Sequence, residues 1–372
     1  MVDGVTFVRN EEQTMLADTL ADLLGASTDM DRTRQLSLTL DAHDQDVWSA
    51  LSQMGLVGLA LPGEFGGAET TFTDVAIVFE ELGRFVAAVP LLSTVSASVA
   101  ILAAGTESQR AALLPPIAAG TAIATLAVYE DPHGGVDAPS TSAARIDGGW
   151  RISGRKRFVT DAPNADLFVV SAVTDDGVRL FAVDAEREGV VVEPVAALDA
   201  TRPLADVTFD VIVGEDAALS GANGVAPLHR ALDVAVVMLA AEQVGVAQRC
   251  LEISVDYAKE RYQFGRAIGS FQAIKHRCAD MLIAVEHARS VAWYAAATLD
   301  DPSEAAIAVP LAKSVCSDAA IKVAGDTIQV LGGIGFTWEH DAHLYFKRAK
   351  SSSLLFGTVE VHRDRLADAI GV

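Results

Sequence analysis

An α+β chain of three consecutive domains is the fold that the sequence predicts: a helical domain, an antiparallel β-domain and a second helical domain. The chain has 372 residues, 51% of them hydrophobic, which is enough to build two or three cores. Its apolar residues repeat at helical spacing through residues 1–118, at a spacing of about two through 119–220, and at helical spacing again through 221–372.

The N-terminal domain, residues 1–118, is predicted to be helical. The segments "EEQTMLADTLADLL", "QDVWSALSQMGLVGLAL" and "FTDVAIVFEELGRFVAAVP" repeat apolar positions three and four residues apart, as helices with one buried face do. Between two of them, "LPGEFGGAET" has the glycine and proline content of a turn.

The middle domain, residues 119–220, is predicted to be an antiparallel β-domain. The turn sequences "DGG" and "DDG" separate short runs rich in Val, Ile, Phe and Trp. An Asp-Gly turn between two such runs is typical of a β-hairpin.

The C-terminal domain, residues 221–372, is predicted to be a bundle of long helices. Cys250, Cys278 and Cys316 fall singly within its helical patterns, without the spacing of a metal or disulfide motif. We therefore expect reduced, buried thiols, as in a cytoplasmic protein.

Composition excludes two classes of partner. The chain has 28 basic and 50 acidic residues, so its formal charge of −22 would repel nucleic-acid phosphates and anionic lipid headgroups. The most apolar run, "LDVAVVMLAAEQVGVA", is interrupted by Asp233, Glu242 and Gln243. We expect no nucleic-acid partner, no membrane span and a cytoplasmic location.

Two C-terminal segments, "RYQFGRAIGSFQAIKHRCADM" (261–281) and "QVLGGIGFTWEHDAHLYFKRAK" (329–350), resemble the acyl-CoA dehydrogenase family. The "LPGEFGG" turn and the segment "WRISGRKRFVTDAPNADLFVV" extend the resemblance over nearly the whole chain. It implies a C-terminal four-helix bundle, assembly as a dimer or a dimer of dimers, and FAD at the subunit interfaces. In this family a carboxylate removes the α-proton of an acyl-CoA thioester while the β-hydrogen leaves as hydride to the flavin.

The resemblance assigns the adenosine and pyrophosphate of FAD to residues that a subunit donates to its neighbour. A guanidinium pairs with phosphate oxygens, and glycine lets the backbone approach a cofactor closely. Either motif alone would be an ordinary helix end or a glycine C-cap, but together they favour cofactor binding. The implied residues are Arg261, Gln263, Gln329, Gly332 and Gly333. The resemblance further implies that Phe264 and Thr358 bind the cofactor.

At the isoalloxazine end, "RFVT" implies that Phe158 packs on the flavin and that Thr160 hydrogen-bonds its edge. The segment "LAVYEDPHGGVD" departs from the family's Thr-Glu-Pro-Gly-Ala-Gly-Ser-Asp pattern, with Tyr129 in place of the threonine and Val136 near the serine. As strand and turn residues these two need no explanation. As family positions they remove two hydroxyl donors from the flavin pocket of this chain.

The segment "LLFGT" falls on the family's Tyr-Glu-Gly-Thr and places Phe356 where the family has its base. A second family position for the base lies thirty residues before Gly265, and here it is Ala235, followed by Val236. Neither phenylalanine nor alanine can accept a proton. The resemblance therefore implies that this chain lacks its own base.

Two other carboxylates lie close in sequence. Glu242 is seven residues after Ala235, on nearly the same helix face but about 10 Å along the axis, and proton transfer requires hydrogen-bond contact. A carboxylate paired inside the bundle is the favoured interpretation of Glu242, and a substitute base the less favoured one. Asp233 falls where relatives have an acid near the CoA end, which implies a substrate contact.

Other chemistry has weaker signals. His340 and His343 have HxxH spacing without an evident third ligand, so we expect no metal site. "GGIGF" lacks the third glycine and the context of a dinucleotide fingerprint. His133 is expected to be a surface turn residue.

Three hypotheses follow for function. The favoured one is a subunit of a hetero-oligomeric, tetrameric acyl-CoA dehydrogenase whose partner supplies the base and which passes electrons to an acceptor such as an electron-transfer flavoprotein. Some actinobacterial members that degrade sterol side chains resemble this arrangement. The second is a homo-oligomeric flavoenzyme with another base or another reaction, such as oxygenation or desulfination, and the third is a non-catalytic family member. Straight, branched and sterol-derived acyl chains all remain open.

Overall fold

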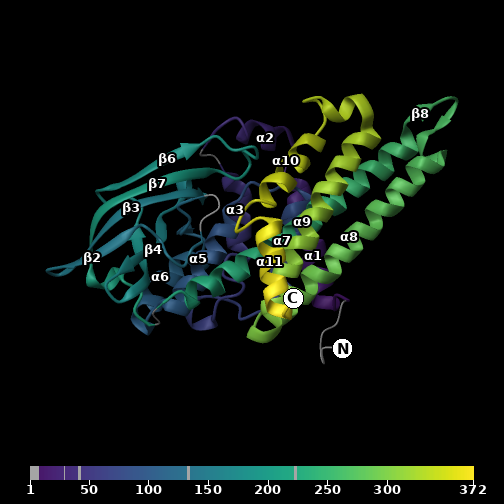
Figure 1. Cartoon of the computed structure of the whole chain (residues 1–372). Helices are drawn as coiled ribbons and strands as arrows, with labels where there is room; N and C mark the ends of the chain where they lie inside the picture. Colours follow the sequence, from purple (N-terminus) through teal and green to yellow (C-terminus); the bar gives the residue numbers. More distant parts are fainter. Residues whose placement is uncertain (1–7, 29, 41–42, 132–134, 222–223) are drawn as a thin grey trace. The chain divides into compact units, whose positions relative to one another are not determined.

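The computed structural model of the chain describes residues 8–28, 30–40, 43–131, 135–221 and 224–372 (Figure 1). The chain divides into two compact units. The sheet unit comprises residues 34–70 and 88–235, and the helical unit comprises residues 1–33, 71–87 and 236–372. The predicted order of helices, β-strands and helices is confirmed, while the N-terminal helices are distributed between the two units.

The N-terminal helices begin at well-defined caps. Asn10, Thr71 and Thr106 each form a capping box, in which the side chain accepts a hydrogen bond from the backbone N–H three residues later. The helices described in this part are α1 (Glu11–Ser27), α2 (Met30–Leu36), α3 (Gln45–Gln53), α4 (Phe72–Arg84), α5 (Leu91–Ala104) and α6 (Glu107–Ala118).

One seven-stranded sheet forms within the described part of the sheet unit, in the order β1-β4-β2-β3-β7-β6, with β5 paired to β4. The predicted hairpins are present, since Ile146 pairs with Gly149 across "DGG" and Thr174 with Gly177 across "DDG". The strands are β1 (Ala124–Ala127), β2 (Ser142–Ile146), β3 (Gly149–Thr160), β4 (Leu167–Thr174), β5 (Gly177–Asp184), β6 (Val190–Val195) and β7 (Leu204–Gly214).

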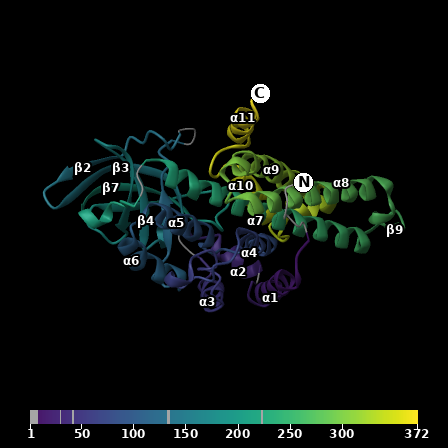
Figure 2. The same cartoon turned by 90° about the horizontal axis from the view of Figure 1, so that it is seen from below.

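The predicted antiparallel β-domain is confirmed in most strand pairs, and β4 adds two parallel pairings. It pairs in parallel with β1, which enters the sheet from α6 rather than through a hairpin, and with β2 at Val173 and Ser142. The helix α5 packs against β1 and β4 (Figure 2). Aromatic edge-to-face pairs, Trp150 with Phe181 and Phe168 with Phe209, fill the core of the sheet unit.

The C-terminal bundle is confirmed. It is built from α7 (Ala226–Glu260), α8 (Gln272–Thr298) and α9 (Pro302–Leu331), followed by α10 (Ala342–Ser352) and α11 (Val359–Ile370), and α8, α10 and α11 all pack on α9. Short connections make α7, α8 and α9 alternate in direction, so the ends of α7 and α9 and the start of α8 lie at the same end of the bundle (Figure 1).

Two glycines allow α4 and α7 to touch through their backbones. A Cβ added at Gly245 would lie 1.8 Å from the carbonyl oxygen of Glu80, and one at Gly83 would lie 2.0 Å from that of Glu242. Any larger side chain at either position would force the helices apart, so glycine sets the distance at this crossing.

Among the described helices, α7 is the one that is long and apolar enough to cross a membrane by length and composition. Its most apolar window is 89% buried within the protein, which is typical of a core helix. Cys250 and Cys316 are buried free thiols and Cys278 is half-buried, as expected for reduced cysteines. Burial raises the pKa of the Cys250 and Cys316 thiols to about 12, so both stay protonated and inert.

Candidate active site

The segment that carries Phe356 connects α10 to α11. Phe356 is half-buried and has a left-handed backbone, with φ of 57°, and Gly357 follows with φ of 102°. Thr358 is the N-cap of α11, where its hydroxyl oxygen accepts a hydrogen bond from the N–H of Val361 at 3.5 Å. Thr358 thus has a structural task in this chain besides any contact with a nucleotide.

Glu242 takes part in an ion pair inside the helical unit. Its side chain is only 3% exposed, and its Oε1 accepts a hydrogen bond from Nη1 of Arg348 at 3.1 Å. Arg348 is equally buried and also donates to the carbonyl of Ala87 at 3.4 Å. A buried carboxylate needs such a partner, because removing an unpaired charge from water is very costly.

The second family position for a base carries an apolar side chain and is buried. Ala235 and Val236 are buried on α7. Asp233 precedes them on the same helix and is half-buried.

The residues assigned to the adenosine side of FAD lie at one end of the bundle and are exposed. Arg261, Gln263 and Phe264 belong to or adjoin the small hairpin of β8 (Tyr262–Gln263) and β9 (Arg266–Ala267), which extends beyond the ends of α7 and α8 (Figure 1). The side chain of Phe264 is 92% exposed, with φ of 54°. Beneath it, the ring of Phe271 meets Phe264 edge to face at 6.2 Å between centroids.

Gln329, Gly332 and Gly333 lie at the C-terminal end of α9, at the same end of the bundle as the hairpin of β8 and β9. Gln329 is exposed on the last turn of α9, Gly332 is the C-cap with φ of 65°, and Gly333 is exposed in the 3₁₀ turn that follows. Two aromatic side chains after this turn are also exposed, Phe336 at 81% and Trp338 at 72%. Large apolar side chains exposed together with an arginine are a common feature of interfaces with another chain.

On the sheet unit, Phe158 and Thr160 lie at the end of β3. A register shift between Lys156 and Val159 forms a bulge there, and it places Phe158 at φ of 53° with its ring half-buried beneath the guanidinium of Arg157. Thr160 is buried, and its carbonyl accepts a hydrogen bond from Thr125 at 2.7 Å.

Of the two residues that depart from the family pattern, Tyr129 lies beside this bulge. The carbonyl of Tyr129 accepts a hydrogen bond from the N–H of Arg157 at 2.7 Å, so its backbone is tied to β3. Tyr129 is half-buried and Val136 is buried. His133, expected to be a surface turn residue, lies outside the described residues.

An ion pair between a buried lysine and a half-buried glutamate, which the sequence interpretation missed, supports the same region. Lys156 is fully buried and donates to Oε1 of Glu130 at 2.7 Å and to the hydroxyl of Ser171 at 3.1 Å. Burial lowers the pKa of Lys156, and the bond and charge of Glu130 oppose this. Burial raises the pKa of Glu130, but hydrogen bonds from Lys156, Thr141 and Ser140 outweigh it and lower the pKa to about 2.

Within the described residues, no group of three histidine, cysteine or acidic side chains is placed to hold a metal ion. Nδ1 of His340 accepts a hydrogen bond from the N–H of Ala342 at 3.1 Å at the start of α10. The ring of His343 packs against Trp338 with centroids 4.7 Å apart. Both histidines thus have structural contacts.

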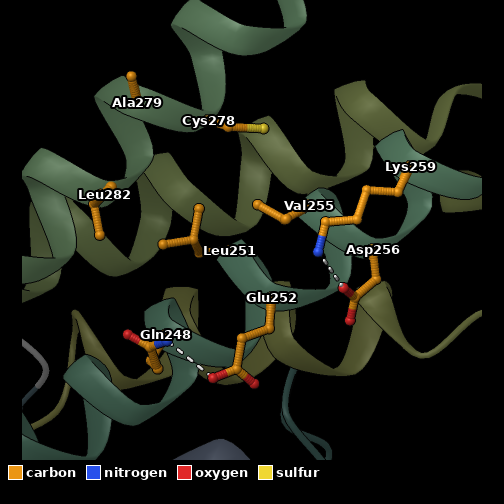
Figure 3. A pocket seen from close by; sticks show the side chains of 9 residues that line it. All are labelled: Gln248, Leu251, Glu252, Val255, Asp256, Lys259, Cys278, Ala279 and Leu282. Carbon is orange, nitrogen blue, oxygen red and sulfur yellow. Dashed lines mark hydrogen bonds and ion pairs between the residues drawn. The ribbon is translucent and has the colours of Figure 1, made fainter. Parts of the chain in front are cut away.

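A groove of about 510 Å³ opens between α7 and α8 (Figure 3). Apolar and polar side chains both line it, with Gln248 donating to Glu252 at 2.9 Å and Lys259 to Asp256 at 3.5 Å. None of the residues that the sequence assigns to substrate or cofactor lines this groove.

Family models match the chain along nearly its whole length. The N-terminal domain of acyl-CoA dehydrogenase matches residues 10–121, the middle domain matches residues 126–212 and the C-terminal domain matches residues 222–371.

Individual proteins agree with these matches. Acyl-CoA dehydrogenase IpdE2 of Mycobacterium tuberculosis is 36% identical over 346 residues, which cover 93% of each chain. A solved structure described as the Tcur3481-Tcur3483 steroid ACAD has a TM-score of 0.88 at 35% identity and covers 97% of this chain and 98% of its own. The ChsE4-ChsE5 complex from Mycobacterium tuberculosis has a TM-score of 0.90 at 28% identity and covers 98% and 99%.

Proposed function

Because the chain belongs to the acyl-CoA dehydrogenase family, we propose that it is one subunit of a hetero-oligomeric acyl-CoA dehydrogenase whose partner subunit supplies the base. The reaction is the α,β-dehydrogenation of an acyl-CoA thioester. A carboxylate of the partner removes the α-proton, the β-hydrogen leaves with both electrons of its bond, and a carbon–carbon double bond forms. FAD, when bound, accepts that hydride.

The observation that carries the proposal is Phe356. A phenylalanine at the family's base position cannot accept a proton, and Ala235 at the second position cannot either. Glu242, the nearby carboxylate on α7, is committed to a buried ion pair with Arg348. A positioned base contributes roughly 100- to 10,000-fold to the rate, so a site without one is a poor catalyst.

The exposed end of the bundle supports the role of donor to a neighbour. Arg261, Gln263 and Gln329 lie at the surface of this chain, where they can contact a nucleotide held by another subunit. Their donor chemistry fits a pyrophosphate, and Gly333 leaves room for its approach. The altered Tyr129 and Val136 lie on the side where the chain would hold its own flavin.

The relatives suggest the partner and the substrate class. Two of the similar solved structures are described as two-component assemblies, and one of these is described as a steroid ACAD. We therefore infer a tetramer with a second family member, a steroid-derived acyl-CoA as substrate, an electron-transfer flavoprotein as acceptor, and a cytoplasmic location.

The test is the visible spectrum and flavin content of the purified chain, alone and co-expressed with a second family member. We expect about one FAD per pair of chains in the complex, and turnover of steroid-derived thioesters only there. If the lone chain holds stoichiometric FAD and turns over at ordinary family rates, the proposal is wrong. If Glu242→Gln then abolishes that turnover with flavin retained, Glu242 is the base. Straight and branched thioesters in the same assay decide the substrate class.

Arg261→Ala in the complex tests the donor role. A charge-assisted hydrogen bond to phosphate is worth about 1.5–3 kcal/mol, so flavin retention should fall by about 10- to 100-fold. Lys259→Ala, also an exposed cation near the end of α7, serves as the matched control. Equal flavin retention in both variants would contradict the donor role.

A further inference from the structure

Two buried side chains hold the backbone on either side of Phe356. Lys313 lies in the middle of α9 and is fully buried, and its Nζ donates to the carbonyls of Ser352 at 2.6 Å and Leu355 at 2.8 Å. His362 on α11 is 1% exposed, and its Nε2 lies 2.9 Å from the carbonyl oxygen of Phe356. Since a carbonyl oxygen only accepts, Nε2 of His362 carries the hydrogen and donates it.

The contact with His362 also favours glycine at position 357, directly after Phe356. A Cβ added at Gly357 would lie 3.0 Å from Nε2 and 3.2 Å from Cδ2 of His362, so the imidazole lies directly against the glycine. Phe356 and Gly357 both have positive φ. A phenylalanine adopts this conformation only when its surroundings determine it, and here three carbonyl contacts do so.

We propose that Lys313 and His362 are positioning residues that fix the backbone at position 356, so that its side chain projects in one direction whatever its chemical nature. This positioning follows from the contacts alone. Its consequence for catalysis rests on the proposed function: the segment remains a preformed mount for a carboxylate although the chain has phenylalanine there.

The charge states of Lys313 and His362 suit the carbonyl groups to which they donate. α10 ends at Ser352, and the last carbonyls of a helix have no partner within it, so the ammonium of Lys313 supplies hydrogen bonds and a charge that favours the negative helix end. Burial lowers the pKa of His362 to about 4; the hydrogen bond to Phe356 opposes this, and Lys313 and Arg365 add to it. His362 is therefore neutral at pH 7, and its Nδ1 has no hydrogen-bond partner among the described residues.

The first experiment measures amide hydrogen exchange of the full-length chain at pH 7. His362→Gln retains an amide N–H that can donate to the carbonyl of Phe356, whereas His362→Leu has no donor. We expect peptides covering residues 353–358 to exchange at least 10-fold faster in His362→Leu and in Lys313→Met, and close to the native rate in His362→Gln. Peptides of the sheet unit should not change in any variant.

The same variants give an electrostatic signature. Lys313→Met removes a cation that lowers the pKa of His362, so that pKa, followed by NMR of the imidazole, should rise. Exchange of residues 353–358 that is unchanged in both Lys313→Met and His362→Leu would overturn the proposal. Equal exchange in His362→Gln and His362→Leu would overturn the donor role of His362, and this comparison stands even if Lys313→Met does not fold.

The consequence for the side chain at position 356 is tested with Phe356→Glu in the full-length chain. Because the flavin pocket of this chain is itself altered, the readout is amide exchange and not turnover. We expect peptides covering residues 353–358 to exchange close to the native rate in Phe356→Glu, and at least 10-fold faster in the double variant Phe356→Glu with His362→Leu. Near-native exchange in Phe356→Glu with His362→Gln would confirm positioning. If Phe356→Glu alone exchanges at least 10-fold faster than the native chain, the segment does not hold a carboxylate as it holds phenylalanine, and the idea of a preformed mount fails.

Discussion

Each compact unit buries one lysine, and the two lysines serve different acceptors. In the sheet unit, Lys156 pairs with the carboxylate of Glu130, which in turn accepts from the N–H groups of Ser140 at 2.6 Å and Thr141 at 2.8 Å. In the helical unit, Lys313 donates to two backbone carbonyls next to Phe356. Lys156 therefore holds the segment of Ser140 and Thr141 through the side chain of Glu130. Lys313 holds the segment around Phe356 through direct hydrogen bonds to its backbone.

The difference predicts different responses to mutation and to pH. A half-buried carboxylate that loses its cation keeps a charge that water solvates only in part, whereas a carbonyl that loses a donor is only a neutral unsatisfied group. The sheet unit should therefore depend on its lysine for stability. The helical unit should depend on its lysine mainly for the local conformation around position 356.

The largest effect is expected from Lys156→Met. Removing one partner of a buried pair costs about 3–5 kcal/mol, and because Glu130 is only half-buried we expect a loss at the lower end of this range in the free energy of unfolding of the sheet unit, measured by urea denaturation. Lys259→Met, at an exposed lysine, is the control and should change little. If Lys313→Met destabilises the protein more than Lys156→Met, the comparison between the two lysines is wrong.

The next effect is a pH dependence that originates at His362. Its pKa is about 4 in the folded chain and about 6.5 in an unfolded one, so the unfolded state takes up the proton first as pH falls. The stabilisation is complete above pH 6.5 and is lost between pH 6.5 and 4, by about 3 kcal/mol at 1.36 kcal/mol per pKa unit. Urea titrations at several pH values should show His362→Gln losing less over this range, with His276→Gln on the exposed part of α8 as control.

A smaller loss of stability, at more acidic pH, is expected from the protonation of Glu130. Its pKa is lowered to about 2 from an ordinary value of 4.5, so its contribution is present above pH 4.5 and is lost as pH falls toward 2. Glu130→Gln should flatten the stability of the sheet unit over this range while leaving the window between pH 6.5 and 4 unchanged. The distinction between the two pH ranges would be wrong if the wild-type protein lost stability over a single range and neither Glu130→Gln nor His362→Gln changed that loss.

The smallest effect is expected from Gly357→Ala. The added methyl group lies 3.0 Å from His362 Nε2 in a backbone conformation that disfavours alanine, so a loss of about 1–2 kcal/mol is expected. Gly224→Ala shares the positive φ but has open space around the new Cβ, and the difference between the two variants isolates the contact with His362. Equal losses would show that backbone conformation, and not the imidazole, determines the glycine.

The sequence predicted the fold because its signals were local. Helical and strand periods, the hairpin turn "DGG" and the family segments all lie within short windows. The parallel pairing of β1 with β4 was not predicted, because strand pairing between residues 124 and 167 leaves no local pattern.

The candidate site follows from the sequence in part for the same reason. Phe356, Arg261 and Gln329 were named from short motifs, and their roles stay predictions. Lys156, Lys313 and His362 were not named, because each acts through contacts with residues distant in sequence or with backbone carbonyls. A signal existed for Lys313, which is a charged residue within the apolar run "AVPLAKSVCSDAA". A lysine there must find a partner inside the protein or remain exposed.

The crossing of α4 and α7 has a consequence for the order in which the chain is synthesised. Residues 71–87 emerge from the ribosome early, yet their glycine-lined backbone contact lies on α7, more than 150 residues later. The sheet unit is complete once residue 235 has emerged, whereas the helical unit must wait for the last helices. During this interval Glu80 and Gly83 of α4 have no native contact with α7, so this part of the helical unit can form only after the sheet unit is complete.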